Sequence, residues 1–481
     1  MCCEERRISI MAFMTTMHTE DVALFSNPPY NTAEDKISWT QYQPTYANIG
    51  GEGYNSINFN ILGNATQYID LSRSKLYVKL RVVKEDGTEW GADESGLPID
   101  MILHTMWSSV DVTLNNIQVS GAGGNYMYKA AIECLLNYGK GTKEIQLQSI
   151  GMSPDTANFD SVKPGDATGG SVNAGLLARR KLFGGDGHGS CDFKGVLLAD
   201  ICNQGRLILD GVDVGITLWP NKNAFRIMSN VQSKIVIENI YLDVCKVQVN
   251  KYCMSGHKAA LEVSNGMYPL QKTVIIAKEL LGGSRGQSWD DIFQGYVPSK
   301  MVIGMVDSNA FNGDFAKNPL RFQHFDIDSL GFTVNGESTP KQPFEYDMAN
   351  NLFIDAFQSL FEITGKAWED SDNGISKEMW KEGLALTAFD CDPTTANDFR
   401  YLGLPKRGHT RLTLKLKNSR ADGIMVIIYA TFPGRVEIDD MRNVTLKGPQ
   451  ELEQQLIEAA QKAKALPKTV ATAAPRIALT G

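Results

Sequence analysis

The residue types that most often bind metals or carry catalysis are scattered along this chain of 481 residues. The six histidines stand at positions 18, 104, 188, 257, 324 and 409, and none forms the HxH, HxxxH or HExxH spacing that puts two ligands on one face. The eight cysteines include no CxxC pair, so a zinc knuckle is not indicated. Two Gly-rich strings, 121–124 and 282–286, are interpreted as loops or hairpins. We therefore expect no catalytic residues, no metal ligands and no cofactor.

Three pairs of acidic residues are the remaining candidates for chemistry: Asp290-Asp291, Asp326/Asp328 and Asp439-Asp440. Glycoside hydrolysis uses two carboxylates about 5–10 Å apart across a cleft, and sequence neighbours do not establish that geometry. Acidic turns are commoner. A cation site at Asp326 and Asp328, on one face of a strand, stays open as the weaker alternative.

The elements around these residues show a long repeat. A strand, a polar turn and an amphipathic helix occur twice, 220 residues apart. The first copy has a strand over 110–114, the turn Asn115-Asn116 and a helix over about 126–138. The second has a strand over 330–334, the turn Asn335-Gly336 and a helix that begins near Tyr346 and includes Leu352. Solenoid units recur at roughly 20–50 residues, so this spacing predicts a duplicated domain instead.

Most of the remaining pattern is typical of strands. Apolar and polar residues alternate over 76–82 and 412–416, as half-buried strands require. The apolar face changes side near Asn239 within 234–249, which predicts a bulge or break. Short strands between Gly- and Pro-rich turns favour a β-sandwich or jelly roll in each half.

Composition changes suggest the boundaries. Residues 1–50 read as an N-terminal arm, 51–250 as a first β-domain with a loop insert at about 140–195, and 251–447 as a second β-domain. The insert is rich in Gly, Ser, Asp and Asn, and is expected to be an outward tower or a contact with a neighbour. Residues 448–481 form a tail.

The tail contains a predicted helix over 450–466, which ends at Pro467. It carries a narrow apolar stripe of Leu452, Leu456, Ala459, Ala463 and Leu466. Such a stripe suits docking onto a partner protein or a membrane surface. The alternative is a helix that packs on its own domain or forms only in part.

Charge and targeting signals limit the partners. The net charge is −8 and basic residues are dispersed, so we expect no sequence-specific nucleic-acid binding. The densest basic cluster, Arg179-Arg180-Lys181, reads as a solvated loop. The N-terminus lacks the apolar core of a signal peptide, so we expect reduced cysteines and a protein made inside the cell. The apolar stretch 424–432 is far shorter than the ~20 residues of a membrane span.

Several strings of the second half carry a family resemblance: Met267–Leu270, Val302–Gly313, Ala316–Pro319 followed by Phe322–Phe325, and Tyr429–Phe432 leading into Val436–Asp439. In these the chain resembles the hexon-type major capsid proteins of Polinton (Maverick) elements and adintoviruses. The resemblance covers about 55–445 and is strongest over 265–440. The arm, the insert and the tail lie outside it.

The resemblance implies a mainly β double jelly roll: two tandem eight-stranded rolls, each with an inserted helix, followed by the C-terminal helix. It implies a structural protein rather than an enzyme, with three copies forming a pseudo-hexagonal capsomer of an icosahedral virion capsid. Expected partners are further copies of the chain, a penton-type single jelly-roll protein, and a maturation protease or an inner membrane reached through the C-terminal helix. Assembly is expected inside the host cell, in the cytoplasm or nucleus.

Two alternatives remain open. The first is a carbohydrate-binding or carbohydrate-cleaving β-sandwich, which predicts exposed aromatic residues and acids on one sheet face. Six of the seven tryptophans, at 90, 107, 219, 289, 368 and 380, do not cluster in the sequence. The second is a domesticated capsid homologue that keeps the fold and no longer assembles.

Overall fold

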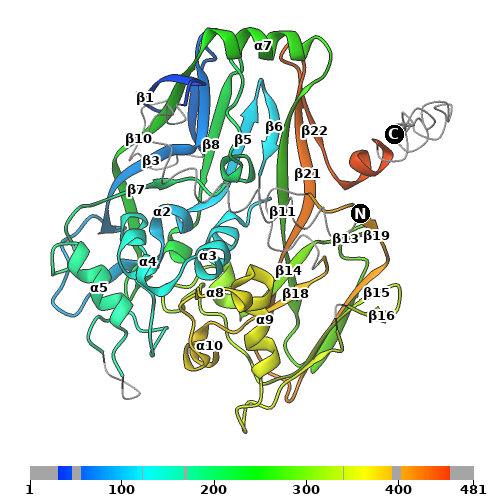
Figure 1. Cartoon of the computed structure of the whole chain (residues 1–481). Helices are drawn as coiled ribbons and strands as arrows, with labels where there is room; N and C mark the ends of the chain where they lie inside the picture. The colour runs from blue at the N-terminus through cyan, green and yellow to red at the C-terminus, as the bar shows by residue number, and fades with distance from the viewer. Residues whose placement is uncertain are drawn as a thin grey trace, which may run out of the picture.

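The computed structural model describes residues 31–45, 56–121, 123–166, 171–339, 341–392 and 402–455 (Figure 1). Strands dominate and fall into two sets, β1 to β10 within residues 34–249 and β11 to β22 within residues 266–447. Helix α7 (Lys251–Leu261) connects the sets. None of the helices in this described part has both the length and the apolar character that crossing a bilayer requires.

The first set forms two four-stranded antiparallel sheets and a small two-stranded one. The first sheet has the order β1 (Glu34–Tyr42), β10 (Ser233–Val249), β3 (Tyr68–Lys84), β7 (Cys191–Val196). The second has the order β2 (Ile57–Ile61), β8 (Val214–Pro220), β5 (Trp107–Leu114), β6 (Ile117–Ser120). The small sheet pairs β4 (Gly96–Pro98) with β9 (Ile227–Ser229).

The second set repeats this arrangement. One sheet has the order β11 (Gly266–Leu280), β21 (Ile424–Ile438), β14 (Lys300–Asp307), β18 (Leu386–Asp390), with β22 (Val444–Lys447) added beside β21. The other has the order β12 (Gly286–Asp290), β20 (Thr410–Leu416), β15 (Ile327–Val334), β16 (Glu337–Ser338), with β17 (Phe344–Glu345) beside β15. Strands β13 (Tyr296–Val297) and β19 (Lys406–Arg407) form a separate pair.

The two sets have the same topology. When the eight main strands of each set are ranked along the chain, the sheet orders are 1-8-3-6 and 2-7-4-5 in both. Strand 1 therefore pairs with 8, 2 with 7 and 4 with 5, while 3 lies beside 6, which is the nested pairing of a jelly roll. The predicted fold, two tandem jelly rolls with inserted helices, is confirmed.

The repeat extends to single hydrogen bonds. Asn115 and Asn335 both have positive φ, at 45° and 53°, in the tight turns after β5 and β15. Such turns favour Asn and Gly because both tolerate the left-handed conformation. The Asn115 side-chain oxygen accepts a 2.8 Å bond from the Asp213 amide, and the Asn335 oxygen accepts a 2.8 Å bond from the His409 amide. The predicted irregularity near Asn239 is also present, as a register shift between Ile237 and Asn239.

The inserted helices differ from expectation in one place. Helix α3 (Tyr126–Asn137) lies where predicted, but α9 (Ile354–Thr364) begins eight residues after Tyr346. The amides of Asp347 and Leu352 each bond to the other's carbonyl, at 2.8 and 2.9 Å, which holds 347–352 in a turn. Leu352, expected on the buried helix face, is therefore 62% exposed.

Two predicted boundaries take a different form in the structure. Residues 34–42, placed in the arm from sequence, form β1 and pair with β10. The insert contains α4 (Lys140–Glu144), η1 (Gln146–Ile150) and α5 (Ala174–Leu182), and its last residues form β7. The remaining short helices are α2 (Ile102–Thr105), η2 (Asp200–Asn203), α6 (Asn223–Arg226), α8 (Ser308–Asn312), η3 (Lys366–Trp368) and α10 (Lys377–Gly383).

The apolar core runs through both rolls as one connected cluster of buried side chains. Trp107 in the first roll and Trp380 beside the second are among the largest fully buried side chains. Because the cluster is continuous, the two rolls pack as one body rather than as two separate domains.

Candidate functional site: the junction between the two rolls

Within the described residues no strand of the first roll pairs with a strand of the second. The rolls are held together by side chains and loops instead. The most specific contacts are four buried or half-buried polar clusters, which lie at different places along the junction. We take this junction as the candidate functional site, because it fixes how one roll is oriented relative to the other.

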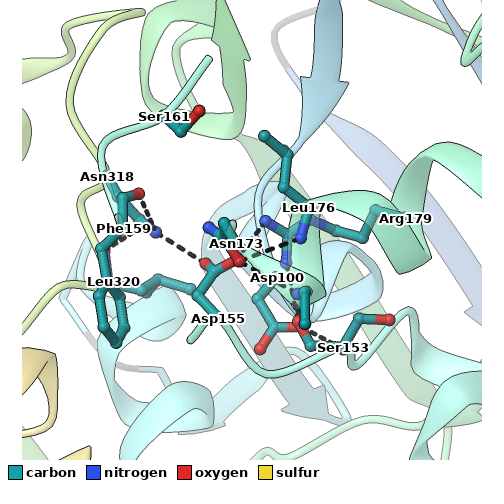
Figure 2. Close-up of polar contacts among 12 residues, drawn as sticks. Asp100, Ser153, Asp155, Phe159, Ser161, Asn173, Leu176, Arg179, Asn318 and Leu320 are labelled. Carbon is teal, nitrogen blue, oxygen red and sulfur yellow. Dashed lines mark hydrogen bonds and ion pairs between the residues drawn. The ribbon is translucent and has the colours of Figure 1, made fainter. Parts of the chain in front are cut away.

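The first cluster is centred on Arg179 of α5 (Figure 2). Asn173 caps this helix by accepting bonds from the amides of Gly175 and Leu176, at 3.1 and 3.2 Å. The Arg179 guanidinium, 2% exposed, lies 2.7 Å from an Asp155 carboxylate oxygen and 4.0 Å from one of Asp100. The basic string 179–181 was interpreted as a solvated loop, and for Arg179 that interpretation is wrong.

Asn318 extends this cluster into the second roll. Its side-chain amide donates a 2.8 Å bond to the other Asp155 oxygen, and its backbone amide donates a 3.0 Å bond to Asp160. Arg321, three residues further on, forms an ion pair with the same Asp160. Figure 2 shows Asp155 between Arg179 on one side and Asn318 on the other. The insert of the first roll is thereby fixed to the loop after α8.

The electrostatics of the cluster follow from its burial. Burial raises the pKa of Asp100 to about 6, and the charge of Asp155 adds to this, while Arg179 opposes it. Asp100 still accepts bonds from the amides of Ser153 and Met101, at 2.6 and 2.9 Å. One buried cation thus serves two carboxylates, so loss of Arg179 would leave both without a counter-charge.

The second cluster surrounds the C-terminus of α3. The Lys143 ammonium donates 2.6 Å bonds to the carbonyls of Leu135 and Asn373, one from each roll. Lys366 of the second roll donates to the carbonyls of Asn137 and Asp372, at 2.9 and 2.6 Å. Cations are favourable at a helix C-terminus because the last carbonyls are unpaired. Burial, and to a lesser degree the charge of Lys366, lowers the pKa of Lys143 to about 8.

The third cluster is centred on Lys129, near the start of α3. Lys129 forms ion pairs with Glu133 and Asp200, at 2.9 and 3.3 Å. Second-roll groups complete it: the Tyr429 hydroxyl donates a 3.2 Å bond to Glu133, and the Thr273 amide donates a 3.1 Å bond to Asp200. Burial raises the pKa of Glu133, and the ammonium of Lys129 opposes this shift.

The fourth cluster joins the rolls near the turn after β5. Arg442 of the second roll bonds to the Asp210 carboxylate at 2.8 Å and to the Asp210 carbonyl at 2.7 Å. The Asn115 side-chain amide donates a 2.7 Å bond to the Arg442 carbonyl. The turn asparagine of the first roll therefore has a second role that Asn335, its counterpart, lacks among the described contacts.

A histidine–tyrosine pair shows how the two rolls diverge. His104 and His324 are 220 residues apart, like Tyr126 and Tyr346. His104 Nδ1 lies 3.0 Å from the Tyr126 hydroxyl, whereas the Tyr346 hydroxyl lies 2.8 Å from Thr387 Oγ1 and His324 Nδ1 accepts from the Asp326 amide. Burial, with the nearby charge of Lys129, lowers the pKa of His104 to about 3.

The predicted docking stripe is described only at its start. Residues 449–455 are helical, and Leu452 is buried. Glu453 bonds to Arg407 and Tyr296, at 2.6 and 3.1 Å, and Gln455 accepts a bond from Arg435. The start of the helix therefore packs on its own second roll. Leu456, Ala459, Ala463 and Leu466 lie outside the described residues, and their docking role stays a prediction.

The acidic pairs and Gly-rich strings occupy turns and strand ends. Asp290 pairs with Arg411, Asp326 lies 3.6 Å from His324 Nδ1, and Asp439 accepts bonds from Asn443. Residues 282–286 match the letters of a G-x-S-x-G elbow, but they lead from β11 of one sheet to β12 of the other, rather than from a strand to a helix. In the described part of the chain no three His, Cys, Asp or Glu side chains are close enough to hold a metal ion.

The junction residues were not found from the sequence. Asp155 and Asn318 are 163 positions apart and Glu133 and Tyr429 are 296 apart, so no local spacing connects them. One signal was available, because Asn318-Pro319 belongs to a string that carries the family resemblance. Asn318 makes three hydrogen bonds with the insert.

Comparison with known proteins finds a relative by sequence and several solved structures with a similar fold. No protein-family model matches the chain. The uncharacterized protein F54H12.2 of Caenorhabditis elegans is 24% identical over 399 residues, which cover 80% of this chain and 91% of that protein.

The solved structures share the architecture at low identity. A chain of the Sputnik virophage, solved by cryo-EM at 3.5 Å, has a TM-score of 0.55 and 10% identity, covering 91% of this chain and 94% of its own. The Faustovirus major capsid protein has a TM-score of 0.52 and 10% identity over 86% and 92%. The mavirus major capsid protein has a TM-score of 0.50 and 9% identity over 90% and 94%. The chain therefore has the double jelly-roll fold of viral major capsid proteins.

Proposed function

We propose that this chain is a structural major capsid protein, of the type found in Polinton elements and adintoviruses. Three copies form a pseudo-hexagonal capsomer, and capsomers tile an icosahedral shell. The observation that carries the proposal is the pair of rolls with identical strand order, packed as one body, in a fold shared with viral capsid proteins over about nine-tenths of the chain. The family strings around Asn318 and Tyr429 support the Polinton-type assignment.

The junction explains how such a chain can act as a tile. A subunit of a closed shell has to present its surfaces at fixed angles, because small errors accumulate around the lattice. Buried ion pairs contribute little net stability, since desolvation offsets the attraction, but one arrangement satisfies them and others do not. Arg179, Lys129 and Arg442 thus specify the angle between the rolls more than they strengthen the contact.

The proposed partners follow from this role. They are further copies of the chain, a penton-type single jelly-roll protein, and a maturation protease or an inner membrane contacted by the C-terminal helix. The protein would lie in the virion capsid after assembly in the host cytoplasm or nucleus. The function needs no catalytic residue and no cofactor.

A second candidate is a domesticated homologue that keeps the fold without assembling. The relative in C. elegans is the reason to consider it, because that animal protein aligns with this chain over 91% of its own length. The two candidates differ in self-association alone, so one measurement separates them.

The test is the mass of the purified full-length chain by light scattering over a range of concentration and salt. The capsid proposal predicts a species of three times 53.0 kDa. A monomer under every condition would contradict it and favour the domesticated homologue.

A further inference from the structure

The outer face of the sheet β1–β10–β3–β7 carries an unusual group of aromatic side chains. Tyr77 and Tyr241 are stacked, with ring centroids 4.4 Å apart and planes 14° apart. The Lys194 ammonium lies 5.6 Å from the Tyr241 ring and pairs with Asp243. Trp39 of β1 lies opposite Cys245, four positions along β10 from Tyr241, and is 58% exposed. Trp and Tyr are the residues most enriched among those that dominate protein–protein binding energy.

The internal repeat gives this patch an exact counterpart in the second roll. Tyr77 pairs with Tyr241 between the third and eighth strands of the first roll, and Val302 pairs with Tyr429 between the same strands of the second. Two residues earlier, Lys75 and Lys300 hold matching positions, opposite Asp243 and Thr431. Trp39 has no part in this correspondence.

The second-roll counterpart is covered by the first roll. Tyr429 bonds to Glu133 of α3, and the neighbouring strand bonds to Asp200 through the Thr273 amide. Val302 and Thr431 are 2% and 3% exposed. The matching face of the first roll is open: Lys75 is exposed, and Tyr77 and Tyr241 are partly so. Figure 1 shows this sheet on the side of the molecule away from the second roll.

We propose that the patch of Trp39, Tyr77, Tyr241 and Lys194 is the docking surface for the second roll of another copy. The contact repeats between chains the contact that α3 and the segment at Asp200 make within one chain. It joins different surfaces of two copies, so it is head-to-tail and generates a ring when the rotation closes. Six rolls in such a ring are three chains. The inference rests on the proposed capsomer and names the surface that builds it.

The side of the second roll that docks is also defined by the repeat. The first roll presents α3 to β11 and β21 and presents β6 to β22, so the second roll would present the side that carries β16. Figure 1 places β15 and β16 at the opposite end of the molecule from β1 and β10. One chain thus has two open docking surfaces at opposite ends: the outer face of the β1–β10–β3–β7 sheet and the side of the second roll that carries β16.

The first test uses wild-type protein and needs no variant to fold. Lysines are acetylated in the dilute and in the concentrated protein, and modification is read by mass spectrometry. We expect Lys75, on the patch, to react at least several-fold more slowly in the three-copy species. Lys258, exposed on α7, serves as the control and should react equally in both.

The second test is Tyr241→Asp, which places a desolvated charge in the contact, with Tyr252→Asp on the exposed surface of α7 as the matched control. We expect the first variant to be a folded monomer by light scattering and circular dichroism, and the control to retain the three-copy mass. A wild-type trimer in which Lys75 reacts freely, or a trimeric Tyr241→Asp protein, overturns the docking surface and leaves the capsomer intact. A wild-type monomer at all concentrations contradicts the capsomer itself, and the docking surface with it. Protection of Lys75 in a monomer by an added oligosaccharide mixture would assign the patch to carbohydrate instead.

Discussion

Helices α3 and α9 occupy the same topological position, between the fifth and sixth strands of their rolls, but their surroundings differ. Eleven of the twelve residues of α3 are buried, whereas only four of the eleven residues of α9 are. The second roll lies against α3, while one flank of α9 faces outward. The comparison shows that a duplicated helix is buried or exposed according to what packs on it. Because the second roll packs on α3, this helix of the first roll belongs to the core that both rolls share.

The largest effect is expected at the insert of the first roll. Arg179→Met removes the one cation between Asp100 and Asp155 and leaves two buried carboxylates uncompensated. We expect a loss of about 3–5 kcal/mol in the free energy of unfolding, measured by chemical denaturation. Lys181→Ala, two residues further along the exposed side of α5, is the control and should change it by less than about 0.5 kcal/mol. Equal effects would mean that the cluster does not support the junction.

The two helices can be compared directly with one substitution. Ile132→Ala on α3 opens a cavity in the shared core and should cost about 2–5 kcal/mol of unfolding free energy. Ile354→Ala at the exposed start of α9 should cost less than about 0.5 kcal/mol. Thermal or denaturant unfolding of both variants measures the difference. Similar costs would show that α9 is buried as deeply as α3 in the isolated chain.

The two histidines should differ in acid. The pKa of His104 is about 3 in the folded chain, far below the ordinary value, so the unfolded state takes up the proton first as the pH falls. Stability is therefore highest above about pH 6.5 and falls as the pH drops toward 3, with a loss of about 2 kcal/mol already at pH 5. We expect His104→Asn to flatten the dependence of unfolding free energy on pH between 7 and 5. His324→Asn should flatten it less, because that side chain is only partly buried. An unchanged slope in His104→Asn would contradict this assignment.

The smallest difference is expected between the two turn asparagines. Asn115→Ala and Asn335→Ala both place Ala at positive φ and both remove the bond to the facing amide. Asn115 alone also bonds to the Arg442 carbonyl of the second roll. We therefore expect Asn115→Ala to be more destabilising by about 0.5–1.5 kcal/mol, the typical net value of one hydrogen bond. Denaturant titration of the two variants side by side measures it, and equal losses would remove the fourth cluster from the junction.

The strands and the duplication could be predicted from sequence because their signals are local. Alternation over 76–82, the turn at Asn115 and the bulge near Asn239 each depend on neighbours in the chain. The start of α9 could not be predicted from sequence, because the backbone bonds between Asp347 and Leu352 hold a turn where the apolar residues follow a helical pattern. The buried state of Arg179 depends on Asp100 and Asp155, which reach it only after the insert has folded back. The start of α9 and the burial of Arg179 both depend on contacts formed in the folded chain, and the spacing of residues in the sequence does not predict such contacts.

The central claim is that one chain is a rigid two-roll tile and that three chains close a ring. Negative-stain electron microscopy of the purified protein, with two-dimensional class averages, tests it most directly. The account predicts a compact particle with six lobes and three-fold symmetry, in which neighbouring lobes within and between chains are equally spaced. Particles with only two lobes at every concentration, or with two lobes at variable separation, would contradict it.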